Sequence, residues 1–215
     1  MTVVRVDELE VVSISAAVPV IQTATLPRPP GKKLSICLIN PRFEPSYWGF
    51  EFALPLYPGD KRSTMISGAL SAVAGLCGEH DVTLVDQNVE DLDWTLISGY
   101  DLVGVTGMIV QKERMREILL KLRELKVFTV VGGPFVSVQE TFFDGLCDAS
   151  FVGEAETTWP TFLDDFSCDQ PTLKRYEQAQ PTDMTKVPRP RFDLLKVDRY
   201  ASGALQYSRG CPFQL

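Results

Sequence analysis

The sequence predicts a doubly wound, flavodoxin-like α/β fold over residues 33–166, built on a five-stranded parallel sheet. Two observations lead to this prediction. Short, nearly continuous apolar runs recur along the region, and each stops at a polar residue or a glycine, as buried parallel strands do. Helical segments lie between the runs, so the strands form right-handed βαβ units with the expected order 2-1-3-4-5.

The five expected strands cover residues 34–39, 82–85, 102–105, 127–131 and, more weakly, 149–152. Residues 111–126 carry an apolar stripe with helical spacing, and charged residues occupy the remaining positions. Residues 63–77 are rich in alanine, leucine and glycine, which predicts a helix packed closely on the sheet. A shorter helix is expected over residues 157–166.

The sequence changes character on both sides of this domain. Residues 1–32 end in Leu-Pro-Arg-Pro-Pro-Gly and are expected to form an extended or disordered arm, because proline removes hydrogen-bond donors and restricts its neighbours. Residues 167–199 are polar and contain four prolines, which is typical of a linker. Residues 200–215 follow this linker and are expected to begin a second domain.

Composition excludes several classes of function. The net charge is −7 and no basic run occurs, which argues against nucleic acid or an anionic membrane surface as a partner. The longest apolar stretches have strand length, so no transmembrane segment is expected. Five cysteines at irregular spacing do not suggest a disulfide framework, and a cytoplasmic location is expected. The single histidine, His80, excludes a multi-histidine metal site and argues against a histidine-activated nucleophile.

Ligands of open parallel sheets bind outside the carboxyl ends of the strands. The loops that follow the five expected strands therefore form a candidate binding rim, and several begin with glycine, which lets a backbone approach a ligand closely. The candidate cofactor-binding residues on these loops are Asn40, Pro41, Arg42, Asp86, Gln87, Asn88, Thr106, Gly107, Met108, Gln111, Gly132, Gly133, Pro134, Gly153, Glu154 and Glu156. No catalytic residue is expected within the chain.

Each loop also has a plainer interpretation. Gly132-Gly133-Pro134 is also compatible with an ordinary strand-to-helix turn, and Met108 with a core position after a turn. Asp86 at a strand end is typical of a residue that caps the following turn. The aromatic loop from Phe43 to Phe52 is too apolar for free solvent, which favours a lid or a contact with another domain. No GxGxxG motif follows the first strand and no P-loop motif occurs, so classical dinucleotide binding is weakly supported.

Taken in order, these motifs resemble the cobalamin-binding radical S-adenosylmethionine enzymes, and most of all the branch that includes the hopanoid methylases. The resemblance spans about residues 33–215. Its signatures are Asn40-Pro41-Arg42-Phe43 with Tyr47-Trp48, Leu84-Val85-Asp86-Gln87-Asn88, residues 106–111 (TGMIVQ), Gly132-Gly133-Pro134, Gly153-Glu154-Ala155-Glu156, residues 187–194 (VPRPRFDL) and residues 206–213 (QYSRGCPF).

The resemblance implies that the rim holds a corrin, with Asn40, Asn88, Met108 and Gln111 nearest to it. It also implies a following partial TIM barrel that carries a CxxxCxxC motif for a 4Fe–4S cluster, which cleaves S-adenosylmethionine to a radical. Cys211 matches the first of these three thiolates, and Leu215 stands where the second is expected. The 215 residues alone are therefore not expected to be active, whereas the parent family is a methyltransferase-type enzyme.

A second departure from the family concerns the cobalt ligand. Many cobalamin domains supply a histidine from a DxHxxG loop after the second strand, and Asn88 stands at that position here. The resemblance then implies cobalamin without a histidine lower ligand, as a methyl carrier for an unactivated carbon. Two alternatives stay open: a non-catalytic interaction or regulatory module that has lost the cofactor, and a flavin or nucleotide at the same rim.

Overall fold

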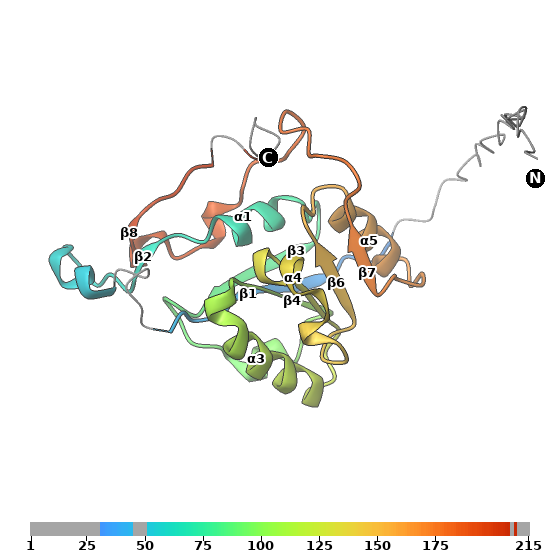
Figure 1. Cartoon of the computed structure of the whole chain (residues 1–215), viewed down its shortest axis with the longest axis horizontal. Coiled ribbons are helices and arrows are strands. Elements are labelled where there is room, and N and C mark those ends of the chain that lie inside the picture. The colour runs from blue at the N-terminus through green and yellow to red at the C-terminus, as the bar shows by residue number, and fades with distance from the viewer. Residues whose placement is uncertain (1–30, 45–50, 207–208, 210–215) are drawn as a thin grey trace, which may run out of the picture.

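The structure, a computed structural model, describes residues 31–44, 51–206 and 209. Its centre is a parallel six-stranded sheet, ordered β3-β1-β4-β5-β6-β7 (Figure 1). The strands are β1 (Ser35–Asn40), β3 (Asp81–Asp86), β4 (Leu102–Thr106), β5 (Thr129–Gly132), β6 (Ala149–Val152) and β7 (Arg175–Glu177). The first five of these strands follow the predicted order 2-1-3-4-5, so the predicted α/β class and topology are confirmed.

The predicted strand number of five was wrong, because β7 adds a sixth strand at the edge. It lies within the segment for which the sequence predicts a linker. Only its central residue, Tyr176, is buried, between Arg175 and Glu177, so the apolar run that marks the other strands is missing. Tyr176 stacks on Phe151 of β6, with ring centroids 4.9 Å apart and an angle of 9° between the planes. The strand β7 is therefore specified by its packing against β6, because its own sequence carries no strand signal.

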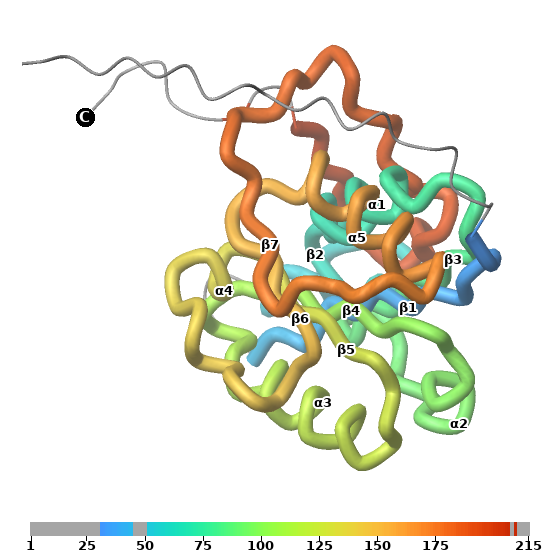
Figure 2. The backbone as a smooth tube through the Cα atoms, turned by 90° about the vertical axis from the view of Figure 1, so that its right-hand side faces the viewer, coloured from blue at the N-terminus to red at the C-terminus, as the bar shows by residue number. Residues whose placement is uncertain are grey.

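Helices cover both faces of the sheet (Figure 2). α1 (Gly68–Gly75) and α5 (Thr158–Ser167) pack on one face, while α2 (Trp94–Ile97) and α3 (Lys112–Glu124) pack on the other. β1 shows why both layers form, because its side chains alternate between them. Ile36 and Leu38 belong to the α1–α5 core, whereas Cys37 and Ile39 belong to the α3 core. All four are nearly or fully buried.

A second, two-stranded parallel sheet pairs β2 (Ser63–Met65) with β8 (Tyr200–Ser202). The helix predicted from residue 63 begins instead at Gly68, after this strand.

The remaining elements are α4 (Pro134–Val138) and short 3₁₀ segments over Glu51–Leu56, Ile109–Gln111, Glu140–Phe143, Phe192–Leu194 and Val197–Arg199. No helix among the described residues has the length and apolar content needed to cross a bilayer.

After β7 the chain passes over α1 to reach β8 (Figure 1). The amide of Arg191 donates a hydrogen bond to the carbonyl oxygen of Ser71, at 2.8 Å. A Cβ added at Gly75 would lie 2.7 Å from the carbonyl oxygen of Arg189, so the absence of a side chain lets the two backbones approach. Leu195 and Tyr200 are buried in the α1–α5 core. This return segment is therefore part of the fold.

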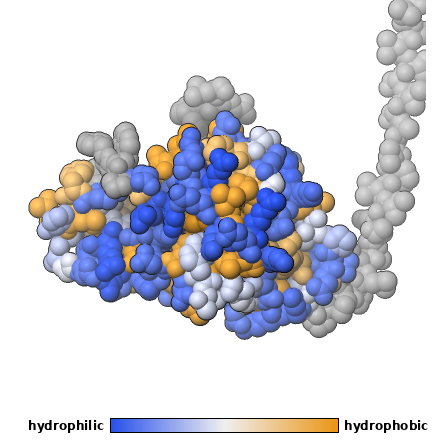
Figure 3. Space-filling model, turned by 90° about the horizontal axis from the view of Figure 1, so that it is seen from below, coloured by the Kyte–Doolittle hydropathy of each residue, from blue (hydrophilic) through white to orange (hydrophobic). Residues whose placement is uncertain are grey.

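The outer surface is mixed in character. Hydrophilic residues and smaller apolar areas alternate over the face that Figure 3 shows. The apolar area at the left of that view lies over the 3₁₀ segment Glu51–Leu56. Phe52, Leu56 and Tyr57 are exposed there, with Leu56 84% accessible.

Candidate functional site

The parallel strands bring five loops to one edge of the sheet, the rim that the sequence predicts. The predicted residues fall into two groups there. A polar group lies after β1, β3 and β4, around Asp86. A glycine-rich group lies after β4, β5 and β6, beside the α1–α5 face. The two groups differ in chemistry, so they are described separately.

The carboxylate of Asp86, at the end of β3, is the centre of the polar group. It is 1% exposed. Its Oδ1 atom accepts hydrogen bonds from the side-chain amide of Asn40 at 3.1 Å, from the backbone N–H of Asn88 at 3.0 Å, and from the side-chain amide of Asn88 at 2.6 Å. Its Oδ2 atom accepts from the hydroxyl of Tyr200 at 2.9 Å. Both oxygens are thus occupied inside the fold, and the bond from Asn88 N is the turn-capping contact considered for this residue.

Gln111 ties the loop after β4 to the end of β1. It is 1% exposed, and its side-chain amide donates to Asn40 Oδ1 at 3.0 Å and to the carbonyl oxygen of Pro41 at 2.5 Å. Its Oε1 atom accepts from the backbone N–H of Met108 at 2.8 Å. This arrangement holds the turn so that the side chains of Met108, Ile109 and Val110 stand in solvent, between 46% and 62% exposed. Met108 is therefore not a core residue, and the rim carries an exposed apolar surface.

Asn88 is also held within the fold. It stands where many cobalamin domains have a histidine ligand, the position singled out in the sequence. Its Oδ1 atom accepts from the backbone N–H of Phe43 at 2.9 Å, and its amide contacts Asp86 and the carbonyl oxygen of Pro41. The neighbouring Gln87 accepts from Arg114 at 3.0 Å and from the backbone of Arg42 at 3.4 Å. These bonds fix the first part of the loop after β1 against the loop after β3.

The glycine-rich group depends on backbone approach. Gly133 has φ +95°, and a Cβ there would lie 2.3 Å from Thr106 Oγ1. A Cβ at Gly107 would lie 2.7 Å from the sulfur of Met115. Because Gly133 has no Cβ, the loops after β4 and β5 pack directly on one another, and Phe135 N donates to the carbonyl oxygen of Gly107 at 3.2 Å. Gly107 instead leaves room for the side chains of Met115 and Gln111. Pro134 then opens α4 at its first position.

An apolar cavity lies behind these glycines, between the sheet and the helices α1 and α5. It has a volume of about 70 Å³, which rises to about 490 Å³ when all space between the atoms and the solvent-open mouth is included. Its lining residues are apolar or glycine apart from Thr106, and they are Leu38, Ala69, Leu70, Val73, Gly104, Val105, Thr106, Val130, Val131, Gly132, Gly133, Phe151, Gly153, Ala155 and Trp159. Ala69 and Gly153 are exposed and stand at the mouth. Sequence reasoning did not include Gly104, although a glycine inside an apolar strand signals a close backbone approach.

The acidic residues of the fifth loop have a different environment. The carboxylate of Glu154 accepts hydrogen bonds from the backbone and hydroxyl of Thr182, at 2.8 and 2.5 Å. These bonds hold the pKa of Glu154 below its usual value, and the bond from the Thr182 hydroxyl contributes most. Glu156 forms an ion pair with Arg209. Both acids therefore engage later parts of the chain.

Some predicted features lie outside the described residues. These are Cys211, most of residues 1–32 and, within the aromatic loop, Tyr47, Trp48 and Phe50. Across the part of the chain that is described, no group of three or more His, Cys, Asp or Glu side chains is arranged to hold a metal ion. His80 lies at the opposite edge of the sheet, where its Nδ1 atom accepts from the backbone N–H of Leu34 at 3.2 Å.

The known proteins to which this chain is similar are methyltransferases. No family model matches the chain. It is 34% identical over 178 residues to an uncharacterized methyltransferase of Synechocystis, covering 82% of this chain and 33% of that protein. It is 28% identical over 187 residues to the hopanoid C-2 methylase of Rhodopseudomonas palustris, covering 83% and 34%. It is 29% identical over 143 residues to the bacteriochlorophyllide d C-8(2)-methyltransferase of Chlorobaculum tepidum, covering 63% and 31%.

The chain thus spans about a third of the length of the curated relatives it matches. Among solved structures, the N-terminal domain of a hypothetical protein of Thermotoga maritima aligns with a TM-score of 0.35 and 19% identity, over 41% of this chain and 74% of that one. A likeness at that level carries no functional conclusion.

Proposed function

We propose that this chain is the cobalamin-binding domain of a radical S-adenosylmethionine methyltransferase, with cobalamin as the methyl carrier. The observation that carries the proposal is the glycine-lined apolar cavity beside the rim. It lies at the carboxyl ends of β4, β5 and β6, which is the ligand position of doubly wound sheets. The names of the relatives support the reaction type, since all of those compared above are methyltransferases or methylases.

The residues present fit a corrinoid in two respects. Cobalamin combines a broad, largely apolar macrocycle with a nucleotide tail that ends in an aromatic base. The exposed side chains of Met108, Ile109 and Val110 offer an apolar surface for the macrocycle. The cavity lining offers apolar side chains and bare backbone to a flat aromatic group, with Gly132 and Gly153 at its edge.

The polar group fits a corrinoid that takes no side-chain ligand from the loop after β3. Both ends of the Asn88 side chain are engaged by Asp86, Pro41 and Phe43, and the single histidine lies at the far edge of the sheet. Bound cobalamin would supply a centre that carries a methyl group for transfer. Asn40, Asp86 and Gln111 would keep the rim rigid beneath it.

The rest of the proposed reaction belongs to a longer protein. We propose that residues 33–166 form the cofactor domain, that residues 1–32 and 167–199 are an arm and a linker, and that residues 200–215 begin a radical S-adenosylmethionine barrel. β7, the return over α1 and Tyr200 of β8 all belong to the cofactor domain, so part of the linker and the first residues after it are built into that domain. Cys211 would be the first ligand of a 4Fe–4S cluster that the barrel completes and that acts on S-adenosylmethionine.

Anaerobic titration with hydroxocobalamin tests the proposal. We expect saturable binding with a change in the corrinoid absorbance spectrum. Ala69→Phe places an aromatic ring at the cavity mouth and is expected to weaken binding at least tenfold. Gly68→Phe is the matched control, because a Cβ there would meet nothing within 4 Å and residue 68 does not line the cavity.

Three results would count against the proposal. The absence of any spectral change would favour a module that has lost the cofactor. A co-purified yellow chromophore with a flavin spectrum would favour flavin binding. Equal affinity in Ala69→Phe and Gly68→Phe would remove the cavity as the binding site.

A further inference from the structure

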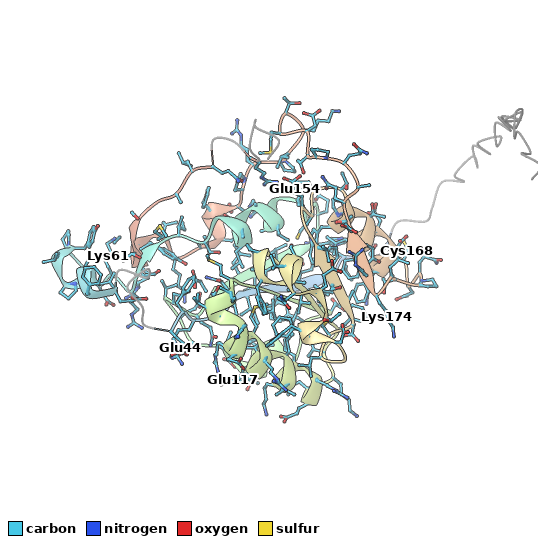
Figure 4. All side chains as sticks on the ribbon, viewed as in Figure 1. Glu44, Lys61, Glu117, Glu154, Cys168 and Lys174 are labelled. Atoms are coloured by element: carbon cyan, nitrogen blue, oxygen red, sulfur yellow. The ribbon has the colours of Figure 1, made fainter. Side chains whose placement is uncertain are left out.

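Small and acidic residues alternate along the loop Gly153-Glu154-Ala155-Glu156, and the two kinds make different contacts. Gly153 and Ala155 line the cavity. Glu154 and Glu156 engage residues that lie much later in the chain. Figure 4 labels Glu154 in the upper half of the molecule, above the sheet. One short loop thus contacts the candidate cofactor cavity and the C-terminal segment.

The C-terminal partner of this loop is Arg209. Its guanidinium forms an ion pair with Glu156 Oε1 and lies 3.5 Å from Glu154 Oε1, and its Nε donates to Gln206 Oε1 at 2.9 Å. The side chains of Arg209 and Glu156 are only 20% and 10% exposed. An ion pair this far from solvent is screened less than one on the open surface, and its hydrogen bonds are charge-assisted. The contact is therefore less sensitive to salt than an ordinary surface pair.

The acidic side of the contact is also held by groups other than Arg209. Thr182 donates its backbone N–H and its hydroxyl to Glu154, and Gln178 contacts the same carboxylate at 3.4 Å. The Thr182 hydroxyl also lies 3.3 Å from Glu156 Oε2. Thr182 thus orients both carboxylates, and little further ordering is needed when the arginine binds them.

Arg209 stands two residues before Cys211 in the sequence. We propose that Glu154 and Glu156 are positioning residues that anchor Arg209 to the loop that lines the cavity. The roles assigned to Cys211 and to the cavity rest on the proposed function, whereas the anchor itself does not. In a full-length enzyme this contact would set the distance between the cofactor domain and the cluster-binding segment.

Limited trypsin digestion of the 215-residue chain measures the anchor directly. Cleavage after Arg209 releases residues 210–215, which mass spectrometry quantifies. Cleavage requires Arg209 to leave its carboxylates, so its rate reports the population of the released state. Glu156→Gln removes the charge with almost no change of shape and is expected to speed this cleavage about tenfold. Thr182→Val, which removes the hydroxyl that orients Glu154, is expected to give a smaller acceleration.

Glu177→Gln is the matched control. It breaks an exposed ion pair with Arg175 at the edge strand β7, at 2.7 Å, and leaves the anchor intact. Glu156→Asp keeps the charge and is expected to restore part of the protection, which a role in packing alone would not explain. Thermal unfolding of each variant is measured alongside the digestion.

The anchor is supported if Glu156→Gln accelerates release of the peptide while Glu177→Gln does not. Equal rates in wild type and Glu156→Gln would overturn it, and so would the same acceleration in both variants, because that result reports general loosening. No corrinoid is present in the digestion. A failed hydroxocobalamin titration therefore bears on the proposed function alone, and unchanged cleavage bears on the anchor alone.

Discussion

The hydroxyl of Tyr200 donates a hydrogen bond to Oδ2 of Asp86 at 2.9 Å, across a separation of 114 residues. Tyr200 begins β8 and is 4% exposed, while Asp86 ends β3. The bond joins the small β2–β8 sheet to the polar group of the rim. The geometry of that group thus depends on a residue that lies far beyond the strands that form the rim.

Removal of this hydroxyl tests how much the link contributes. Tyr200→Phe leaves one oxygen of a buried carboxylate without its donor, so the free energy of unfolding is expected to fall by about 1–3 kcal/mol. Urea denaturation measures this change. Tyr100→Phe is the control, because the hydroxyl of Tyr100 donates to Thr83 Oγ1 at 2.8 Å in an exposed setting. Its effect is expected to stay within about 0.5 kcal/mol. Equal losses in the two variants would contradict the assigned role.

The same link predicts a dependence on alkaline pH. Burial, and then the negative charge of Asp86, raise the pKa of Tyr200 above its ordinary value of 10.0. The unfolded chain therefore releases this proton first, and the contribution of Tyr200 to stability is complete below about pH 10 and declines above it. The stability difference between wild type and Tyr200→Phe should stay constant up to about pH 9.5 and shrink as the pH rises from about 10 to about 11.5 in urea titrations. A difference that stays constant over this range would exclude the effect.

Thiol labelling tests the core on the α3 side of the sheet. Burial raises the pKa of Cys147 to about 11, with smaller contributions from the charges of Asp148 and Asp144, and burial raises that of Cys37 to about 12. Cys147 is partly exposed, so its reaction with N-ethylmaleimide should accelerate about tenfold per pH unit between about pH 8 and pH 10. Cys37 is fully buried and should stay unlabelled until the protein unfolds. Peptide mass spectrometry distinguishes the two sites.

The sequence predicts the central strands well because each one carries its own signal. Residues 34–39 and 102–105 are apolar runs that end at polar residues, and they form β1 and β4. β7 lacks such a signal, since only Tyr176 faces the core and its partner Phe151 comes from another strand. β2 lies within a stretch whose composition favours a helix, and its pairing with β8 is set by residues more than a hundred positions away.

The candidate site was predictable in position and less so in detail. The rule that parallel strands end at one edge brings Asn40, Asp86 and Gln111 together without further information. That their polar atoms bind one another depends on side-chain geometry and on Tyr200, neither of which a local pattern contains. The cavity likewise needs α5 and β6 to form its walls.

Substitution by alanine should have very different effects on stability at the two adjacent glycines of the rim. At Gly132 a Cβ would lie 3.4 Å from Cβ of Phe151, an ordinary contact, and the backbone has no left-handed φ. Gly132→Ala is therefore expected to change the free energy of unfolding by less than about 1 kcal/mol. At Gly133, with φ +95° and Thr106 Oγ1 at 2.3 Å from a Cβ, the loss should be about 2–3 kcal/mol.

Hydroxocobalamin binding by Gly132→Ala tests the shape of the cavity separately from the stability of the fold. Gly132 and Phe151 both line the cavity, so the methyl group of Gly132→Ala narrows it in a protein that remains stable. We expect this variant to bind hydroxocobalamin more weakly than wild type at unchanged urea midpoint, by about threefold to tenfold, which corresponds to about 0.7–1.4 kcal/mol. Wild-type affinity in Gly132→Ala would mean that the base of the cofactor does not enter the cavity, even if the corrin sits on the rim.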